Sequence, residues 1–335
     1  MDGTANLAWL ATKGIKLTNH FAVTHPSQPN YVATVGGDYF GMNNNLLTSI
    51  DRNVSSVVDL LEAKGISWSE YQEDMPYTGF QGSGFPNPTT GANAYVRKHN
   101  PAIQYNSVAA DAGRLARTKN LTLFWDELAA GTLPQWMFIT PNMTSDGHDT
   151  SVTVAGQWTR AFLEPLLENP RFANRTLVLV TFDENATYAR ANRVVGLLLG
   201  DAVPAARRGT ADDAFYNHYS TIASVAANWG LHSLGRWDVG ANVWRLVAEQ
   251  TGDVVRPWAG PVPLAQMYWN QSYDGVFNEG PFPVYPRPNL DIQRGGRTVL
   301  PEIERVWRGS TNPGYYEDKI EVPDGLHPPP GYGFH

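Results

Sequence analysis

Residues 24–31, which read THPSQPNY, hold the clearest candidate nucleophile of the chain. They follow a predicted strand over residues 16–23 and precede a helical pattern over residues 31–35. In doubly wound α/β folds ligands bind where strands end, and a hydroxyl at the start of the next helix meets free N–H groups and the positive end of the dipole. Both stabilise a bound phosphate and a serine alkoxide, so Ser27 is a candidate nucleophile. Capping of the helix by Ser27 is the alternative.

Acidic residues follow two predicted strands, over residues 136–140 and 176–181, at the point where each strand ends. The residues are Asp146, His148 and Asp149 after the first strand, and Asp183 and Glu184 after the second. Neighbouring carboxylates repel one another unless they are solvated or neutralised by a cation. A hard divalent cation, or zinc if a histidine joins, is the natural partner. Loop acids that cap helices are the alternative for either cluster alone.

Further candidates are His218, just before a helical pattern over residues 220–229, and the pair Lys98 and His99. Lone histidines are more often structural than catalytic, so these depend on what surrounds them in the folded chain. His20 and His25 lie close to Ser27 in sequence and are also able to face a site there.

Composition excludes several classes of function. The 335 residues are 42% hydrophobic and 17% charged, as in a folded globular protein, and the net charge of −7 gives no electrostatic footprint for nucleic acid or an anionic membrane. There is no cysteine, so disulfides and thiolate chemistry are excluded. No stretch reaches the roughly 18 to 20 apolar residues of a membrane span.

Six Asn-x-Ser/Thr sequons favour a secreted protein, because they are about twice the number expected by chance. Ordinary Asn-rich loops are the alternative. The six are Asn53, Asn120, Asn142, Asn174, Asn185 and Asn270. The first residues show no signal-peptide pattern, so a secreted protein is expected to have lost its natural N-terminus here. We predict secretion, or a cell-wall or vacuolar location.

The order of the patterns predicts one α/β domain over residues 1–255. Apolar runs alternate with helical segments at residues 54–64, 157–167 and 220–229, which predicts a mainly parallel central sheet flanked by helices. The run at residues 176–181 is typical of a strand buried on both faces. Residues 256–335 are rich in proline and aromatic residues, so we predict a loop-rich extension without regular helices that wraps the same domain.

Six colinear segments resemble the phosphoesterase family that contains fungal secreted acid phosphatases and, more distantly, bacterial acid phosphatases and phospholipases C. They are residues 25–31 (HPSQPNY), 68–76 (WSEYQEDMP), 95–101 (YVRKHNP), 142–151 (NMTSDGHDTS), 181–185 (TFDEN) and 217–220 (NHYS). The resemblance covers residues 20–240 in the right order. It implies an alkaline-phosphatase-like fold and a hydroxyl nucleophile that attacks phosphorus.

The resemblance also implies roles for the candidate residues. Ser27 takes the nucleophile position, and Asn30 donates a hydrogen bond to a phosphoryl oxygen. Asp183 and Glu184 match the acidic metal pair. The other implied roles are second-metal binding or leaving-group protonation for His148 and His218, and phosphate contact for Lys98 and His99. With the ligands Asp146 and Asp149 we predict a divalent metal ion, with zinc, calcium, magnesium and iron all open.

One departure from the family concerns its first strand, which ends in Glu-Asn and supplies further metal ligands. Nothing before Lys16 matches it, so the sequence predicts a chain that lacks this strand. We predict an acid phosphatase that hydrolyses small phosphate monoesters through a phosphoserine intermediate. The alternatives are a phosphodiesterase or phospholipase C of the same family, and a catalytically silent truncated glycoprotein. The oligomeric state is open.

Overall fold

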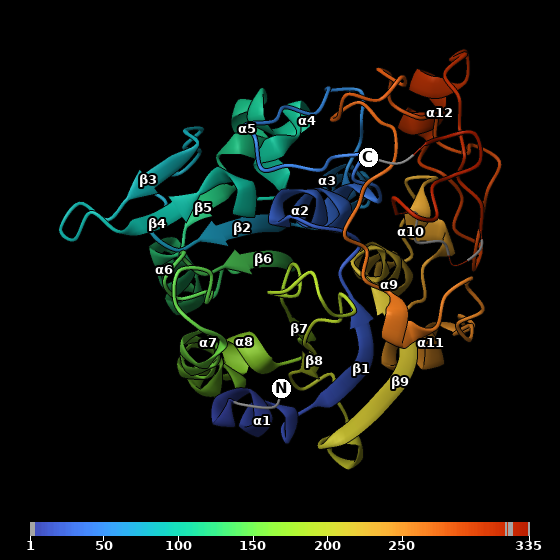
Figure 1. Ribbon diagram of the computed structural model, residues 1–335. Coiled ribbons are helices and arrows are strands. Elements are labelled where there is room, and N and C mark those ends of the chain that lie inside the picture. The colour runs from blue at the N-terminus through green and yellow to red at the C-terminus, as the bar shows by residue number, and fades with distance from the viewer. Residues whose placement is uncertain (1–3, 319, 321–323, 334–335) are drawn as a thin grey trace. The chain divides into compact units, whose positions relative to one another are not determined.

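The computed structural model describes residues 4–318, 320 and 324–333 (Figure 1). Two compact units emerge, and each is assembled from separate stretches of chain. The first unit comprises Met1–Thr18, Ile66–Thr181 and Val195–Asp212, and the second comprises Asn19–Gly65, Phe182–Val194 and Asp213–His335. The predicted boundary at residue 255 is therefore not found, because the extension belongs to the second unit together with residues 19–65.

A three-stranded parallel sheet lies in the first unit, with β2 (Trp68–Gln72) between β5 (Thr118–Asn120) and β6 (Trp136–Thr140). The register runs from Trp68 opposite Trp136 to Gln72 opposite Thr140. All five residues of β2 are buried, as expected for a strand with a neighbour on each side.

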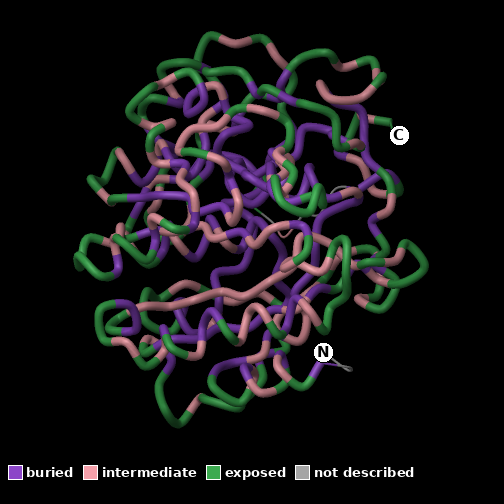
Figure 2. The backbone as a smooth tube through the Cα atoms, turned by 90° about the vertical axis from the view of Figure 1, so that its left-hand side faces the viewer, coloured by how far each residue is buried: buried purple, intermediate pink, exposed green. Residues whose placement is uncertain are grey.

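A four-stranded sheet has the order β7 (Val178–Thr181), β8 (Gly196–Leu199), β1 (Ile15–Phe21) and β9 (Thr210–Asn217). β8 runs antiparallel to both β7 and β1. The predicted α/β class is confirmed. The prediction of a mainly parallel central sheet is wrong, because β8 runs antiparallel to both of its neighbours. β8 is buried throughout whereas β7, predicted to be buried on both faces, is half-buried at all four residues because it is the outer strand (Figure 2).

The helices largely match the predicted segments. In the first unit α1 (Ala5–Ala11) packs on α7 (Val152–Leu167). In the second unit α9 (Tyr219–Trp229) contacts α2 (Ser27–Gly36). The remaining elements are α3 (Val57–Ala63), α4 (Asn106–Ala109), α5 (Ala112–Leu115), α6 (Thr122–Ala130), α8 (Pro170–Ala173), α10 (Trp237–Gly240), α11 (Arg245–Thr251), α12 (Pro301–Trp307), β3 (Gly84–Pro86) and β4 (Asn93–Val96).

Local sequence signals explain where these helices begin and end. Ser56 and Asp59 form a capping box at the start of α3. Gly37 and Gly230 end α2 and α9 in the left-handed region, at φ of 74° and 59°, which glycine adopts at little cost. None of the helices in the described ranges combines the length and apolar character that a bilayer span requires.

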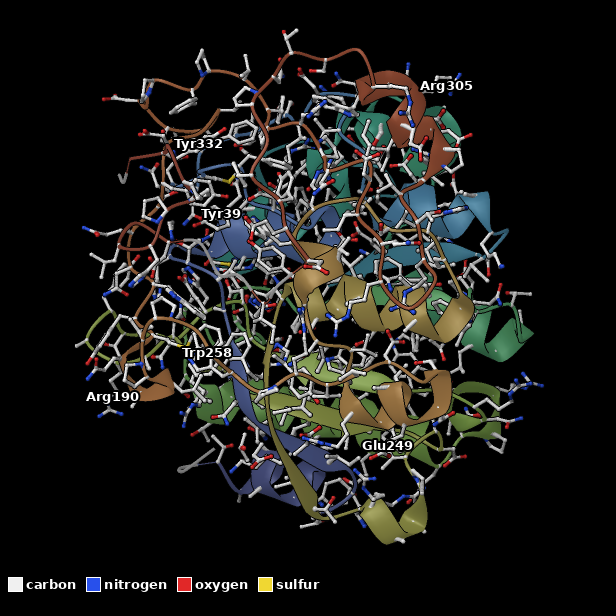
Figure 3. The ribbon with its side chains drawn as sticks, turned by 90° about the vertical axis from the view of Figure 1, so that its right-hand side faces the viewer. Tyr39, Arg190, Glu249, Trp258, Arg305 and Tyr332 are labelled. Carbon is white, nitrogen blue, oxygen red and sulfur yellow. The ribbon has the colours of Figure 1, made fainter. Side chains whose placement is uncertain are left out.

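The extension belongs to the second unit and, contrary to the prediction of no regular helices, includes α12, which begins at a proline in the first helical turn. Tyr332, labelled in Figure 3, stacks on Phe282 and meets Tyr315 edge-on. Tyr315 in turn stacks on Trp237, at 5.5 Å between ring centroids. Aromatic packing therefore replaces regular secondary structure in this part of the chain.

A fully buried carboxylate, Asp38, ties the extension to the residues that follow α2. Its Oδ2 accepts hydrogen bonds from the hydroxyls of Tyr315 at 2.7 Å and Tyr316 at 2.6 Å, and its Oδ1 accepts one from Tyr273. Burial and the nearby carboxylate raise the pKa of all three tyrosines, so each hydroxyl stays a donor. Asp38 is thus the shared acceptor of three buried phenols.

We expect Asp38→Ala to lower the free energy of unfolding by about 3 kcal/mol or more, because three buried hydroxyls lose their acceptor. Urea denaturation followed by tryptophan fluorescence measures this. Asp213→Ala is the control, since its side chain is 91% exposed, and we expect less than about 0.5 kcal/mol for it. Equal losses in the two variants would contradict the role of Asp38.

Glu70 in β2 gives the first unit a pH-dependent stability. It is fully buried, its Oε1 accepts a hydrogen bond from the Ala102 N–H at 3.0 Å, and burial raises its pKa from 4.5 to about 8. The native chain therefore keeps a proton that the unfolded chain releases, and stability falls as pH rises between about 5 and 8. We expect this fall in the urea midpoint to shrink in Glu70→Gln. Glu168→Gln, at an exposed position, should keep the full fall of the urea midpoint with pH. If Glu70→Gln also keeps it, Glu70 is not the group responsible for the pH-dependent stability.

Candidate active site

Ser27 is the first residue of α2 and is 3% exposed. Its Oγ donates a hydrogen bond to Glu184 Oε1 at 2.9 Å. The two residues are 157 positions apart in the sequence, and both belong to the second unit. A serine hydroxyl paired with a carboxylate is a nucleophile next to a base, the pairing that activates hydroxyls for covalent catalysis.

The second oxygen of Glu184 holds His25. Its Oε2 is hydrogen-bonded to His25 Nδ1, and the imidazole is buried with its ring stacked on Tyr188 at 4.1 Å between centroids. Glu184 therefore has one oxygen on the nucleophile and one on a fixed histidine. This third group orients the base, as catalytic hydroxyl–base pairs require.

Asn30 fixes the loop that carries the candidate nucleophile, Ser27. Its Oδ1 accepts from the N–H groups of Val23 and Thr24 at 2.9 and 3.3 Å, and its Nδ2 donates to the carbonyls of Thr24 and Pro26 at 2.8 and 3.1 Å. Both amide N–H bonds are used within the protein, and the side chain is fully buried. The predicted hydrogen bond from Asn30 to a phosphoryl oxygen is therefore replaced by a positioning role.

His218 fixes the backbone beside Glu184. Its Nε2 is hydrogen-bonded to the carbonyl oxygen of Asp183 at 2.6 Å, and burial lowers its pKa to about 4. The neutral ring is thus favoured above about pH 4. Burial therefore argues against His218 as the proton donor to the leaving group, while its other predicted role, binding of a second metal, stays a prediction.

Buried imidazole nitrogens gather around this pair of acids. The ring of His20 lies 5.9 Å from that of His218, and burial lowers the pKa of His20 to about 3. Both ring nitrogens of His20, Nδ1 of His218 and Nε2 of His25 have no hydrogen-bond partner among the described residues. The second unit therefore holds three buried imidazoles, each of which can offer a metal at most one ring nitrogen, and imidazole nitrogen is a donor that divalent transition metals accept.

Asp183 and Glu184 stay the predicted metal pair, half-buried and adjacent. In residues 4–318, 320 and 324–333, however, no three histidine or acidic side chains are arranged to hold a metal ion. Glu184 is engaged by Ser27 and His25, and Asp183 Oδ1 accepts the Glu184 N–H at 2.9 Å. The donor types fit a divalent cation, while the pair supplies only part of a coordination shell.

The other predicted residues form a separate network in the first unit. His99 Nδ1 pairs with Asp146 Oδ2 at 3.2 Å, and His148 Nδ1 pairs with Asp149 Oδ1 at 2.7 Å. Lys98 Nζ lies 3.3 Å from His148 Nε2. The predicted ligands Asp146 and Asp149 are thus paired with histidines, and this pairing lowers the pKa of Asp149. Of the four predicted acids, Asp146 and Asp149 belong to the first unit, and Asp183 and Glu184 belong to the second.

The structure adds His25 and Tyr188 to the candidate residues. His25 was noted in the sequence only for its closeness to Ser27, and its partner Glu184 is 159 positions away. Tyr188 is 52% exposed and lies four residues after Glu184. A histidine two positions before a candidate nucleophile was the one available signal.

Known proteins share these segments. The model of the phosphoesterase family matches residues 2–232. The acid phosphatase of Aspergillus fumigatus is 49% identical over 92% of this chain and 69% of its own length, and the phosphate-repressible acid phosphatase of Penicillium chrysogenum is 55% identical over 81% and 64%. Among solved structures, the phosphonate monoester hydrolase of Silicibacter pomeroyi has a TM-score of 0.46 and 13% identity, with 76% of this chain and 72% of that chain covered.

The chain thus spans about two thirds of the length of these two fungal relatives. The resemblance predicted from six short segments is confirmed by the match over residues 2–232, which includes the nucleophile loop, both acidic clusters and His218. The chain belongs to the phosphoesterase family.

Proposed function

We propose that the chain is an acid phosphatase that hydrolyses phosphate monoesters through a phosphoserine at Ser27. The observation that carries the proposal is the hydrogen bond from Ser27 Oγ to Glu184 Oε1 at the start of α2. The names of the fungal relatives, 49% and 55% identical, support the same reaction. The helix N-terminus at Ser27 supports binding of an anionic ester.

The first step follows from this geometry. Glu184 accepts the hydroxyl proton as Ser27 Oγ attacks phosphorus, so a P–O bond to serine forms and the P–O bond to the leaving group breaks. The leaving alkoxide takes a proton, for which the His148 ring, resupplied from solvent, is the proposed donor. His25 holds the second oxygen of Glu184 and so keeps the carboxylate directed at Ser27.

The second step reverses the roles. Glu184, once it has released its proton, accepts one from a water molecule that attacks phosphorus. The bond between phosphorus and Ser27 Oγ breaks, serine recovers a proton, and inorganic phosphate leaves. Asn30 and His218 act only through the backbone, by holding the nucleophile loop and the Asp183 carbonyl in place.

A divalent metal ion, held by Asp183 and Glu184, remains part of the proposal. When bound, it would neutralise charge on the phosphoryl oxygens and lower the pKa of the attacking hydroxyl. Lys98 and His99 are proposed to contact phosphate, and His148 to protonate the leaving group. The exposure of the His148 side chain, 42%, supports access to solvent protons.

We further propose that the chain is secreted, or is held in the cell wall or vacuole, and that its sequons carry N-linked glycans. The six sequons support this. The net charge of −7 gives no electrostatic footprint for nucleic acid, and the names of the fungal relatives support small phosphate esters as the partners.

A second candidate function, a phospholipase C or diesterase acting on apolar esters, is favoured by one observation. Leu46 and Leu47 are each 70% exposed on a loop tied to the residue after the nucleophile. Gln28 Nε2 donates to the Leu46 carbonyl at 2.8 Å, and Asn45 Oδ1 accepts from the Gln28 N–H at 2.9 Å. An ordered loop thus holds two exposed leucines beside Ser27, where an apolar leaving group gains from contact.

We expect the double variant Leu46→Ser, Leu47→Ser to lower kcat/KM for an aryl or long-chain phosphate ester about tenfold while leaving glycerol phosphate within about twofold, because only the first kind of ester buries apolar surface. The paired change Val254→Ser, Leu326→Ser removes two other 70% exposed residues and should alter neither substrate. If the ratio of kcat/KM for the apolar ester to kcat/KM for glycerol phosphate stays constant in the leucine variant, apolar contact between the ester and this loop is excluded.

Hydrolysis of p-nitrophenyl phosphate from pH 3 to pH 8, with and without EDTA, tests the proposed function. Acid-shifted turnover that EDTA abolishes supports the phosphatase and its metal. Turnover that persists in EDTA supports the phosphatase activity and contradicts the proposed requirement for a metal ion. If only bis(p-nitrophenyl) phosphate is hydrolysed, the second candidate replaces the first.

A further inference from the structure

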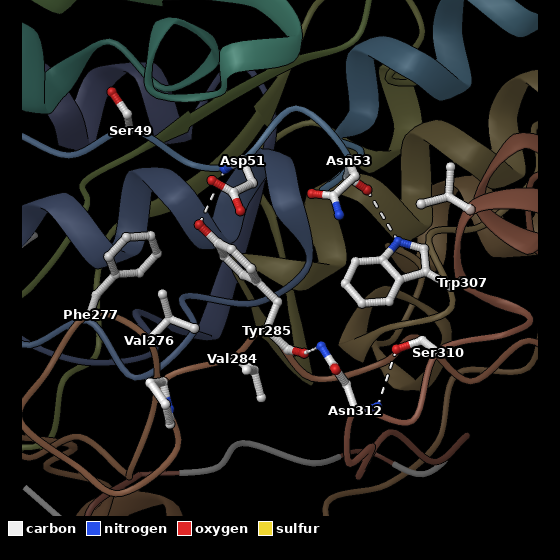
Figure 4. Close-up of a pocket in the computed structure, with 12 residues that line it drawn as sticks. Ser49, Asp51, Asn53, Val276, Phe277, Val284, Tyr285, Trp307, Ser310 and Asn312 are labelled. Atoms are coloured by element: carbon white, nitrogen blue, oxygen red, sulfur yellow. Dashed lines mark hydrogen bonds between the residues drawn. The ribbon is translucent and has the colours of Figure 1, made fainter.

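A cavity of about 560 Å³ lies within the second unit, outside the cluster around Ser27 (Figure 4). Its walls combine the aromatic rings of Tyr285 and Trp307 with the aliphatic side chains of Val284 and Val306. Val284 is 39% exposed and Val306 is 48% exposed. The cavity therefore presents apolar surface to solvent, which is the kind of surface that a ligand covers.

Asn53 lines this cavity and belongs to the sequon Asn53-Val54-Ser55. Figure 4 shows its amide directed into the space between Tyr285 and Trp307. The backbone at this position is fixed, because Trp307 Nε1 donates a hydrogen bond to the Asn53 carbonyl at 3.1 Å. The first atoms of a group attached to the Asn53 amide nitrogen would thus lie inside the cavity.

The polar groups around the cavity suit a sugar. Asp51 is exposed beside Tyr285, whose hydroxyl accepts the Asp51 N–H at 3.2 Å. Ser310 and Asn312 lie on another side of the cavity, where Ser310 Oγ accepts the Asn312 N–H at 3.1 Å. A pyranose has an apolar face of C–H groups and a rim of hydroxyls, so it matches aliphatic walls with polar edges. A volume of this size also falls within the range of small-ligand pockets.

The other sequons differ from Asn53. Four of them already use the amide nitrogen inside the protein and are half-buried. Their acceptors are the carbonyl of Met75 for Asn120, Asp74 Oδ2 for Asn142, the carbonyls of Ala191 and Arg193 for Asn185, and the carbonyl of Tyr188 for Asn270. Asn174 is exposed like Asn53 but does not line this cavity. Asn53 is thus the sequon whose amide opens into this built pocket.

We propose that Asn53 carries an N-linked glycan whose first N-acetylglucosamine residue occupies this cavity. Nδ2 of Asn53 loses one proton and bonds to the anomeric carbon of the sugar, while the diphosphate of a lipid-linked oligosaccharide donor leaves. The sugar then covers Val284 and Val306. This inference rests on the proposed secretory route but not on the proposed activity, so the two fail separately.

Native deglycosylation tests the proposal. The chain is secreted from a eukaryotic host, and the occupancy of each sequon is followed by peptide mass spectrometry during treatment with peptide N-glycosidase. We expect the Asn53 glycan to be released at least about tenfold more slowly from native than from denatured protein, because the cavity covers the bond that the enzyme cuts. The glycan of exposed Asn174, where present, serves as the accessible comparison.

Substitutions in the cavity and trimming of the glycan separate burial from a general effect. Val284→Asp, Val306→Asp should restore rapid native release at Asn53. An endoglycosidase that leaves only the first sugar should keep the Tm of the intact glycoprotein, whereas Asn53→Gln should lower Tm by a few degrees and Asn174→Gln should not. An unmodified Asn53 in the secreted protein, or equal native and denatured release rates, overturns the proposal.

Discussion

Ser27→Ala is expected to lower kcat for p-nitrophenyl phosphate by about a thousandfold or more, because Ser27 is the proposed site of the covalent intermediate. The lost hydroxyl donates to Glu184 Oε1 at 2.9 Å and occupies the first position of α2. Since alanine is a good helix former, the helix itself should persist. Initial rates at the pH optimum, together with the urea midpoint, measure the two effects separately.

The control for this variant is substrate binding. Ser27→Ala should retain inorganic phosphate as a ligand, because the helix N-terminus and the neighbouring groups are unchanged. Isothermal titration with phosphate at acid pH measures this. A Ser27→Ala protein that keeps more than about a tenth of the parent kcat would show that Ser27 is not the nucleophile.

Glu184→Gln should reduce kcat by about 100- to 10,000-fold, since the amide keeps the shape of the side chain but accepts no proton from Ser27. KM should change much less, because Glu184 is proposed to act on the hydroxyl during the reaction and not on the bound ester alone. His25 also loses its carboxylate partner in this variant. Stopped-flow and steady-state rates for a series of leaving groups give kcat and KM separately.

Asp183→Asn is the matched comparison, because Asp183 is the neighbouring acid and its Oδ1 accepts the Glu184 N–H at 2.9 Å. If added Zn²⁺ or Mg²⁺ restores Asp183→Asn but not Glu184→Gln, Glu184 acts as the base in addition to its part in holding the metal ion. A Glu184→Gln protein with kcat within about tenfold of the parent would contradict the base assignment.

The sequence could predict which segments carry the candidate residues, because binding and catalytic groups of α/β folds lie where strands end. Ser27 follows β1, and Asp183 and Glu184 follow β7, as their patterns indicated. The helices around them were also predictable, since Gly37 and Gly230 mark their ends. Short-range signals of this kind depend on a few neighbouring residues and survive without knowledge of the fold.

The sequence could not predict how the segments meet. The same apolar run at β7 suits a buried parallel strand or a half-buried outer antiparallel one, and only pairing with β8 decides between them. The Asn30 amide is fully hydrogen-bonded to nearby backbone groups, and His218 is buried. The spacing of residues in the sequence reveals neither fact. The contact between His25 and Glu184 joins positions 159 residues apart.

The division into units was also hidden in the sequence. Proline and aromatic residues correctly marked the extension, but its partners lie far back in the chain, as Asp38 with Tyr315 and Tyr316 shows. Composition reports how a segment folds locally, whereas the contacts that define a unit depend on side chains hundreds of residues apart.

The most direct test of the central claim is to trap the covalent intermediate. The enzyme is mixed with a ³²P-labelled monoester at acid pH, quenched with acid within milliseconds, digested and mapped by mass spectrometry. We expect phosphate on the peptide that contains Ser27, absent from Ser27→Ala and released by water at a rate no slower than kcat. Turnover with phosphate on another residue, or on none when the chemical step is shown to precede rate-limiting release, would contradict it.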